Sequence, residues 1–163
     1  MNFKKIICFV TALSLCFTLI CMGGCSQKAE LTAGVIEITC GDSTIQPEGY
    51  NTDTFLNNQY SKEDVPSVGD LASSMQEIEC TKSELSALHL RLKGTHDDKV
   101  LFSVYDTAYR IQSFETESFN VPDDNGKYYI CVRVKWIGDS EMGTNPDDYI
   151  YTDYYYLLNI KQD

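Results

Sequence analysis

Few residue groups in this sequence combine the side-chain types and spacing that chemistry requires. The sequence contains no serine-nucleophile elbow, zinc-protease helix motif, paired C-x-x-C or nucleotide-binding glycine loop. Of its two histidines, His89 alternates with leucines and is expected to face solvent. His96 precedes Asp97 and Asp98 in a polar run that we interpret as a turn. Metal ligands must converge from several directions, so we predict no metal site at this run. Because the motifs of known catalytic and nucleotide-binding sites are missing, we also predict no cofactor and no enzyme activity.

A second polar group lies in the connection 137–148. Its carboxylates are Asp139, Glu141, Asp147 and Asp148. Oxygen-rich loops can bind calcium, but the twelve-residue pattern of a calcium loop is absent here. We therefore interpret this connection as a solvated acidic turn between two strands.

The last apolar segment is rich in tyrosine. A strand alternates its side chains between two faces, so Tyr149, Tyr151 and Tyr155 should share one face while Tyr154 and Tyr156 take the other. Accessible tyrosines offer a large rigid area at low entropic cost, which suits recognition. The alternative is packing against the preceding strand, including cation contacts. That strand offers Tyr129, Arg133 and Lys135. We take Tyr149, Tyr151 and Tyr155 as the candidate binding surface.

The chain begins with the pattern of a secretory signal. The basic start Met1 to Lys5 precedes an apolar run from Ile6 to Met22, and small residues follow at the expected cut. Met22-Gly23-Gly24-Cys25 resembles the lipobox of bacterial lipoproteins, although leucine is commonest where Met22 stands. The resemblance implies that residues 1–24 are removed and that diacylglycerol is attached to Cys25. Residues 25–33 would then be a flexible tether on the extracytoplasmic face of the cell membrane.

Composition limits the partners of the mature chain. Lys4 and Lys5 leave with the leader, so 11 basic residues remain against 24 acidic ones, a formal charge of −13. This charge argues against nucleic-acid binding, which needs clustered Lys and Arg. Beyond Cys25 the mature chain has Cys40, Cys80 and Cys131. We interpret them as small apolar fillers, and a disulfide from Cys131 to Cys40 or Cys80 is the alternative.

Alternating apolar residues predict short strands separated by turns. We expect a hairpin over 34–47 and a long irregular connection over 48–69. The alternative for 48–69 is an ordered connection anchored by Tyr50, Phe55, Leu56 and Tyr60. Residues 82–93 are ambiguous, because a capping box at Thr81 to Glu84 favours a helix closed by Gly94, whereas Leu88, Leu90 and Leu92 alternate as in a strand. We choose a strand for 87–93. Further strands are expected at 100–104, 109–114, 119–122, 128–136 and 149–160.

These elements indicate an all-β fold, an antiparallel β-sandwich or barrel in a single domain over 34–163. In the strand 128–136, Tyr128, Ile130, Val132, Val134 and Trp136 should form the buried face.

The run from Asp124 to Ile130 resembles the D-x-G-x-Y-x-C corner of immunoglobulin-like domains, with Ile130 in the place of the cysteine. The resemblance implies that the Tyr128 hydroxyl bonds back to nearby backbone. The fold-defining residues would be Asp124, Gly126, Tyr128 and Trp136. More broadly, an immunoglobulin-like core over about 77–160 is similar to extracytoplasmic modules of Gram-positive bacteria, including modules attached to membrane peptidases related to the antibiotic sensor BlaR1.

The sequence therefore predicts a lipid-anchored, non-catalytic binding or sensory module, with an envelope protein or peptide as its partner. Two further hypotheses stay open. One is an inhibitor of an extracellular protease or other envelope enzyme, with the 137–148 loop at its edge. The other is an envelope hydrolase.

Overall fold

The computed structural model describes residues 29–163, so the predicted leader and Cys25 lie outside the described residues. The regular structure of the described part of the chain is mostly β-strand, as predicted. Its strands are β1 (Val35–Cys40), β2 (Ser43–Ile45), β3 (Gly49–Leu56), β4 (Gln59–Lys62), β5 (Gln76–Thr81), β6 (His89–Lys93), β7 (His96–Tyr105), β8 (Ile111–Thr116), β9 (Gly126–Ile137) and β10 (Tyr149–Lys161). Two one-turn helices are α2 (Val68–Leu71) and α3 (Lys82–Leu85).

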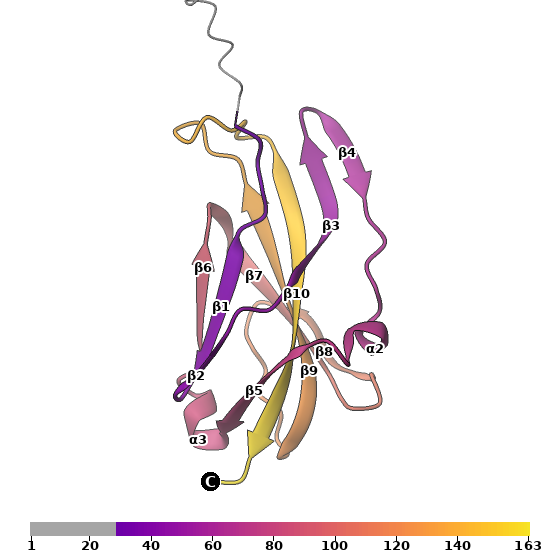
Figure 1. Cartoon of the computed structure of the whole chain (residues 1–163), viewed down its shortest axis with the longest axis vertical. Coiled ribbons are helices and arrows are strands. Elements are labelled where there is room, and N and C mark those ends of the chain that lie inside the picture. The colour runs from indigo at the N-terminus through magenta and orange to yellow at the C-terminus, as the bar shows by residue number, and fades with distance from the viewer. Residues whose placement is uncertain (1–28) are drawn as a thin grey trace, which may run out of the picture.

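The strands form two sheets, whose arrangement is seen in Figure 1. The smaller sheet has the order β2-β1-β6 and the seven-stranded sheet has the order β4-β3-β10-β9-β7-β8. β5 joins the larger sheet by pairing in parallel with the second half of β10, and every other pair is antiparallel. The expected all-β, mainly antiparallel architecture is therefore confirmed, and it is sandwich-like.

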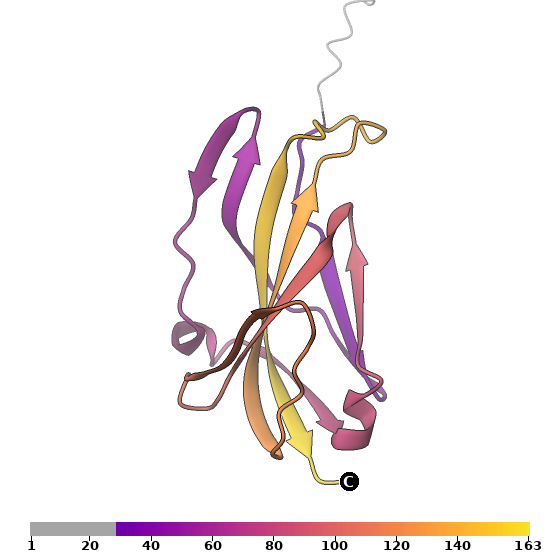
Figure 2. The same cartoon turned by 180° about the vertical axis from the view of Figure 1, so that it is seen from behind.

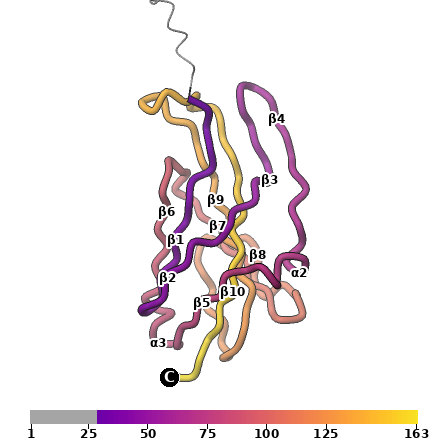
Figure 3. The backbone as a smooth tube through the Cα atoms, in the orientation of Figure 1, coloured from indigo at the N-terminus to yellow at the C-terminus, as the bar shows by residue number. Residues whose placement is uncertain are grey.

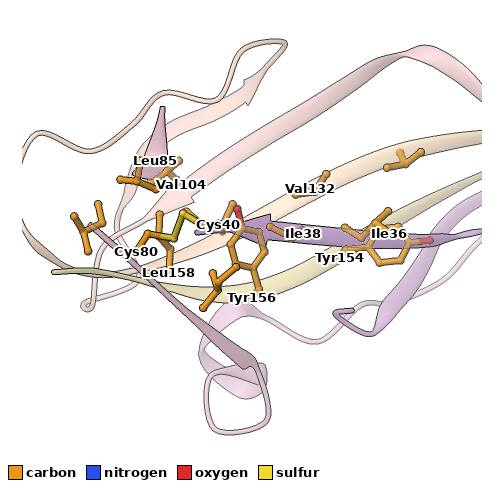
Figure 4. Close-up of a cluster of buried hydrophobic side chains, with 14 of the residues drawn as sticks. Ile36, Ile38, Cys40, Cys80, Leu85, Val104, Val132, Tyr154, Tyr156 and Leu158 are labelled. Atoms are coloured by element: carbon orange, nitrogen blue, oxygen red, sulfur yellow. A yellow bond between two sulfur atoms is a disulfide. The ribbon is translucent and has the colours of Figure 1, made fainter. Parts of the chain in front are cut away.

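The two sheets enclose one apolar core between them. Along β9 and β10, alternate residues are fully buried, including Val132, Trp136, Tyr154 and Tyr156. They face Ile36 and other residues of β1 from the small sheet, as the close-up in Figure 4 shows. Both predicted buried faces are therefore confirmed, because a two-residue period in a strand puts alternate side chains on one side. Each large apolar side chain buried in this way stabilises the fold by ~1.5–3 kcal/mol.

The predicted N-terminal hairpin is confirmed as β1 and β2, which pair around Gly41. The prediction of an irregular connection over 48–69 is wrong, because β3 and β4 form a second hairpin there. Its turn is Asn57-Asn58, where both residues have positive φ (53° and 62°). This is the backbone of the tight hairpin turn that asparagine tolerates. β3 is then held by pairing with β10, about 100 residues further along the chain.

The capping box and the alternating leucines of residues 81–93 both correspond to observed structure, but each belongs to a different segment. Thr81 and Glu84 form the capping box, which opens α3, and the helix ends at Leu85 rather than at Gly94. Residues His89–Lys93 then form β6, so the choice of a strand is confirmed. The helix is one turn long and ends before the alternating leucines begin. Leu85 is its one buried residue.

Two further predictions need correction. The strand expected at 109–114 is β8, which begins at Ile111 and ends at Thr116. Residues 119–122 form no strand; they cross the edge of the sandwich, where Phe119 packs against Phe102 with ring centroids 5.7 Å apart. Phe119 is the residue of this segment that packs against the core, whereas Val121 is 44% exposed.

The prediction that the three mature cysteines are apolar fillers is wrong for two of them. Cys40 and Cys80 form a disulfide, with Cα atoms 6.0 Å apart, that links β1 of the small sheet to β5 of the large one (Figure 4). The alternative pairing with Cys131 is also wrong, since Cys131 is a buried free thiol on the other face of β9.

The described chain begins and ends at opposite ends of the molecule. The C-terminus lies beyond β10 at the end near α3, whereas residue 29 lies near the connection between β9 and β10 (Figures 1 and 3). The expected flexible tether over 25–33 needs correction for residues 29–33. Leu31 and Ala33 are partly buried against the core. These two apolar residues alternate with the exposed Glu30 and Thr32, and their parity is opposite to that of Ile36, Ile38 and Cys40, the buried residues of β1.

Candidate functional site

The large sheet has a second face, which the small sheet does not cover. On β10 the alternate residues Tyr149, Tyr151 and Tyr155 are half-buried, although their neighbours along the strand are buried. The sequence therefore assigned the two faces of β10 correctly. Figure 2 views the molecule from behind, with the small sheet on the far side. We call the set Tyr50, Phe55, Tyr149, Tyr151 and Tyr155 the tyrosine face.

One end of the tyrosine face is a cluster around Tyr149. The Tyr149 ring stacks on Phe55 of β3, with centroids 5.7 Å apart and planes 19° apart. Tyr151 meets Tyr149 edge-on at 5.6 Å. The Lys135 ammonium lies 5.0 Å from the Tyr149 ring centroid and 5.9 Å from that of Tyr151. These contacts fix both rings in place, so the cluster offers a rigid mixed aromatic and cationic surface.

The other end of the tyrosine face is built on Tyr155. Its ring lies 6.1 Å from Tyr50 of β3, in an edge-on arrangement. Its hydroxyl donates a hydrogen bond to Asp153 (3.3 Å). Burial raises the pKa of Tyr155 well above its usual range, so the hydroxyl stays protonated. Beside it, Tyr50, Leu71 and Met75 help to line a small cavity of about 80 Å³.

Between the two ends lies an ionic group that is centred on a buried carboxylate. Arg133 of β9 contacts Asp153 of β10 through two nitrogens, Nε at 2.7 Å and a terminal nitrogen at 2.9 Å. A further guanidinium nitrogen contacts Glu115 of β8. The side chain of Asp153 is only 4% exposed. The hydrogen bond to Asp153 raises the pKa of Arg133 despite the cost of burial, so the guanidinium remains charged. This group links β8, β9 and β10 beneath the tyrosine face, and we call it the ionic floor.

Cys131 lies on the same side of β9 but is not available for chemistry. The side chain is 6% exposed. Burial raises the pKa of its thiol far above the usual range, and the nearby Asp153 carboxylate acts in the same direction. Since the thiolate is the reactive form, we expect this thiol to be inert in the folded protein.

Sequence reasoning considered Tyr50, Phe55 and Tyr60 only as anchors of a connection, and it missed the two strands that place them on this face. Tyr50 and Phe55 come from the stretch expected to be irregular, and Tyr60 of β4 adds an exposed ring whose hydroxyl contacts Asp53. The signal that could have found them is Asn57-Asn58 between two aromatic runs, which is typical of a tight hairpin.

The histidines do not contribute to this face. His89 is exposed, as expected. His96 packs edge-on against Trp136, with ring centroids 6.0 Å apart, and its Nδ1 lies 2.8 Å from the backbone oxygen of Asp97. The run is thus the start of β7 rather than a turn. Across residues 29–163, no group of three or more His, Cys, Asp or Glu residues is arranged to hold a metal ion.

The acidic connection between β9 and β10 is held by internal hydrogen bonds. Asp148 is buried and accepts bonds from the Asn57 backbone N–H (2.9 Å) and from Asn145 Nδ2 (3.0 Å). Asp139 accepts a bond from the Glu141 N–H (2.8 Å). Asp148 is thus not solvated as predicted, because it ties this connection to the β3–β4 turn. Met142 at the tip is 68% exposed.

The fold-defining residues expected from the immunoglobulin-like resemblance lie at two places on β9. The Tyr128 hydroxyl donates a hydrogen bond to the backbone oxygen of Asp124 (3.1 Å), as the resemblance implies. Gly126 between them has φ of +140°, which favours glycine. Trp136 is buried, and its indole N–H donates to the Tyr154 hydroxyl (3.1 Å). Tyr154 in turn donates to the Gly34 backbone oxygen (2.6 Å), which joins the two sheets.

No helix within residues 29–163 is long and apolar enough to span a bilayer. Comparison with known proteins adds no relative: no family model, no curated protein and no solved structure matches this chain.

Proposed function

We propose that this protein is a lipid-anchored, non-catalytic binding module on the extracytoplasmic face of the cell membrane. Its immunoglobulin-like β-sandwich would bind a protein or peptide of the cell envelope through the tyrosine face. The proposed membrane location rests on the sequence Met22-Gly23-Gly24-Cys25, with diacylglycerol on Cys25.

The single observation that carries the binding proposal is the uncovered tyrosine face on the large sheet. Its rings are held in position by stacking, by Lys135 and by the ionic floor, so little side-chain freedom is lost on binding. Aromatic residues with one polar end are enriched at protein interfaces for this reason. Cys131, the one free thiol among the described residues, is buried, which gives no support to a hydrolase that uses a cysteine nucleophile.

The placement of residue 29 favours this reading over the protease inhibitor. The 137–148 loop, which an inhibitor would insert into a cleft, lies at the same end of the molecule as residue 29. Only three residues separate Ala29 from Cys25. A lipid on Cys25 would therefore turn this loop toward the membrane, whereas the tyrosine face on the side of the sheet would stay accessible.

Two measurements in the native host test the proposal. Mass spectrometry of the native protein should show an N-terminal Cys25 carrying diacylglycerol, and Cys25→Ser should move the protein out of the membrane fraction. An unmodified thiol or an uncut leader would contradict the anchor without bearing on the binding face.

The second measurement is site-specific photo-cross-linking in living cells. A photoreactive benzoylphenylalanine replaces Tyr151 in the tyrosine face, or Val35, a 45% exposed residue of the small sheet, as the control. We expect a discrete cross-linked product from position 151 and none from position 35. Equal products from both positions, or none from either, would contradict the proposed face.

A further inference from the structure

The edge strand β8 is unusual for the outer strand of a sheet. It pairs with β7 on one side and, among the described residues, with no strand on the other (Figure 2). Ile111 and Phe114 of this strand are 59% and 56% exposed. Proteins protect free edges with lysine, proline or inward charges, because unpaired backbone groups invite another strand. β8 has neither lysine nor proline. Its pairing with β7 is bulged on both sides of Val104, and its outer backbone groups have no strand partner among the described residues.

A hollow of about 260 Å³ lies directly beside this edge. Val104 of β7 forms part of its floor, and Val121 and Tyr128 line its walls. Because Ser113 pairs with Val104, its side chain turns toward the same side of the sheet. The Ser113 hydroxyl oxygen is buried and has no hydrogen-bond partner within the described structure. A buried hydroxyl without a partner costs about 1–3 kcal/mol. Because Ser113 lines the hollow, a polar group that enters the hollow would remove this cost.

Two carboxylates and one lysine lie at the rim of the hollow, where the Lys82 ammonium contacts the backbone oxygen of Asp123. Asp123 and Asp124 line the hollow, and neither carboxylate belongs to an ion pair among the described residues. The other carboxylates near β8 are matched, since Glu115 contacts Arg133 and Glu117 contacts Lys99. The whole chain has a formal charge of −11. A second acidic copy of this chain is thus a poor occupant, and a basic segment is a good one.

We propose that β8 and the neighbouring hollow form a docking site for an extended, basic peptide segment of a partner protein. The segment adds as a strand to the outer edge of β8. One of its apolar side chains enters the hollow, where a polar group of the segment bonds to Ser113, and flanking lysine or arginine residues meet Asp123 and Asp124. This mode draws affinity from backbone hydrogen bonds and specificity from alternate side chains. The site goes beyond the proposed function: it lies at the far edge of the sheet from β3 and does not depend on the lipid anchor.

The probe is a fluorescein-labelled heptapeptide in which lysine alternates with valine, added to the full chain purified in mild detergent. Fluorescence anisotropy should give saturable binding. Two control peptides separate strand addition from charge. One carries N-methyl groups on alternate backbone amides, which block pairing but keep every charge, and we expect at least tenfold weaker binding. The other replaces lysine by glutamate and should not bind.

Variants of the chain locate the site. Ile111→Lys and Phe114→Lys change exposed side chains, so the fold should tolerate them, and each should weaken binding at least tenfold. Val35→Lys places the same charge on an exposed residue of the small sheet and should leave binding unchanged, as should Tyr151→Ala in the tyrosine face. Ser113→Ala provides the sharpest result. We expect weaker binding by several-fold together with an unchanged or higher melting temperature, because the lost hydroxyl has no partner in the free protein.

Several outcomes would overturn the proposal. Equal binding of the plain and N-methylated peptides would show attraction by charge alone. Failure to bind at millimolar peptide would remove the site altogether. A dimer in analytical ultracentrifugation that Phe114→Lys dissolves would assign the edge to a second copy instead. None of these results alters the cross-linking expected at position 151, so the two proposals fail separately.

Discussion

At the scale of single residues, the main energetic feature is the ionic group under the tyrosine face. Asp153 is nearly enclosed, and its charge is balanced by two contacts from Arg133. Removing one partner of such a pair leaves a buried charge without compensation. Replacing both partners by apolar residues costs far less, since no charge has to leave water.

The Arg133 pair gives the first prediction. Arg133→Met should lower the free energy of unfolding by about 3–5 kcal/mol in urea denaturation. Adding Asp153→Leu should recover most of that loss. The matched control is Lys99→Met, which breaks an exposed pair with Glu117 (side chains 71% and 64% exposed) and should cost less than about 1 kcal/mol. Equal losses from Arg133→Met and Lys99→Met would show that the buried pair has no special role.

At the scale of elements, the β3–β4 hairpin decides whether the tyrosine face is complete. It supplies Phe55 and Tyr50, which contact Tyr149 and Tyr155 of β10. Its turn holds two consecutive non-glycine residues with positive φ. Asparagine adopts this left-handed conformation more readily than most residues, and glycine adopts it without steric cost.

The hairpin turn gives the second prediction. Asn58→Ala places a Cβ-bearing, non-bonding side chain at φ +62° and should lower the free energy of unfolding by about 1–2 kcal/mol. Asn58→Gly at the same position is the control and should be neutral or slightly stabilising. Chemical denaturation measures both changes. The turn assignment fails if the alanine variant is as stable as the glycine variant.

At the scale of the whole molecule, the disulfide joins the two sheets across the core. Cys40 and Cys80 are 40 residues apart in the chain. Closing a loop of this length restricts the unfolded chain and is worth about 4 kcal/mol in the chain-entropy model. The crosslink therefore reinforces the packing of the small sheet on β5 and β10.

The disulfide gives the third prediction. Cys40→Ala with Cys80→Ala should lower the free energy of unfolding by about 2–4 kcal/mol. Dithiothreitol should lower the denaturation midpoint of the wild-type protein but not that of the double variant, which serves as the control. In a chain that begins at Ser26, a thiol reagent should modify nothing in the native state and only Cys131 after unfolding. Two or more reactive thiols per unfolded, unreduced chain would contradict the crosslink.

Local pattern was sufficient to predict the parts of this protein that depend on one strand at a time. Alternation in residues 128–136 and 149–160 identified β9 and β10 and assigned both faces of each, because a strand sorts its side chains by parity alone. The tyrosines of the candidate site were found for the same reason. The capping box at Thr81 was also readable, since its hydrogen bonds lie within four residues.

Tertiary structure alone decided what depends on distant partners. β3 looked irregular by itself because its partner β10 lies about 100 residues away, and pairing rather than propensity makes it a strand. Cys40 and Cys80 come together only when the small sheet packs on β5. The open edge of β8 is likewise a property of strand order, which no stretch of sequence records. Short-range periodicity determined the faces of the strands, and long-range pairing determined which faces and edges remain free.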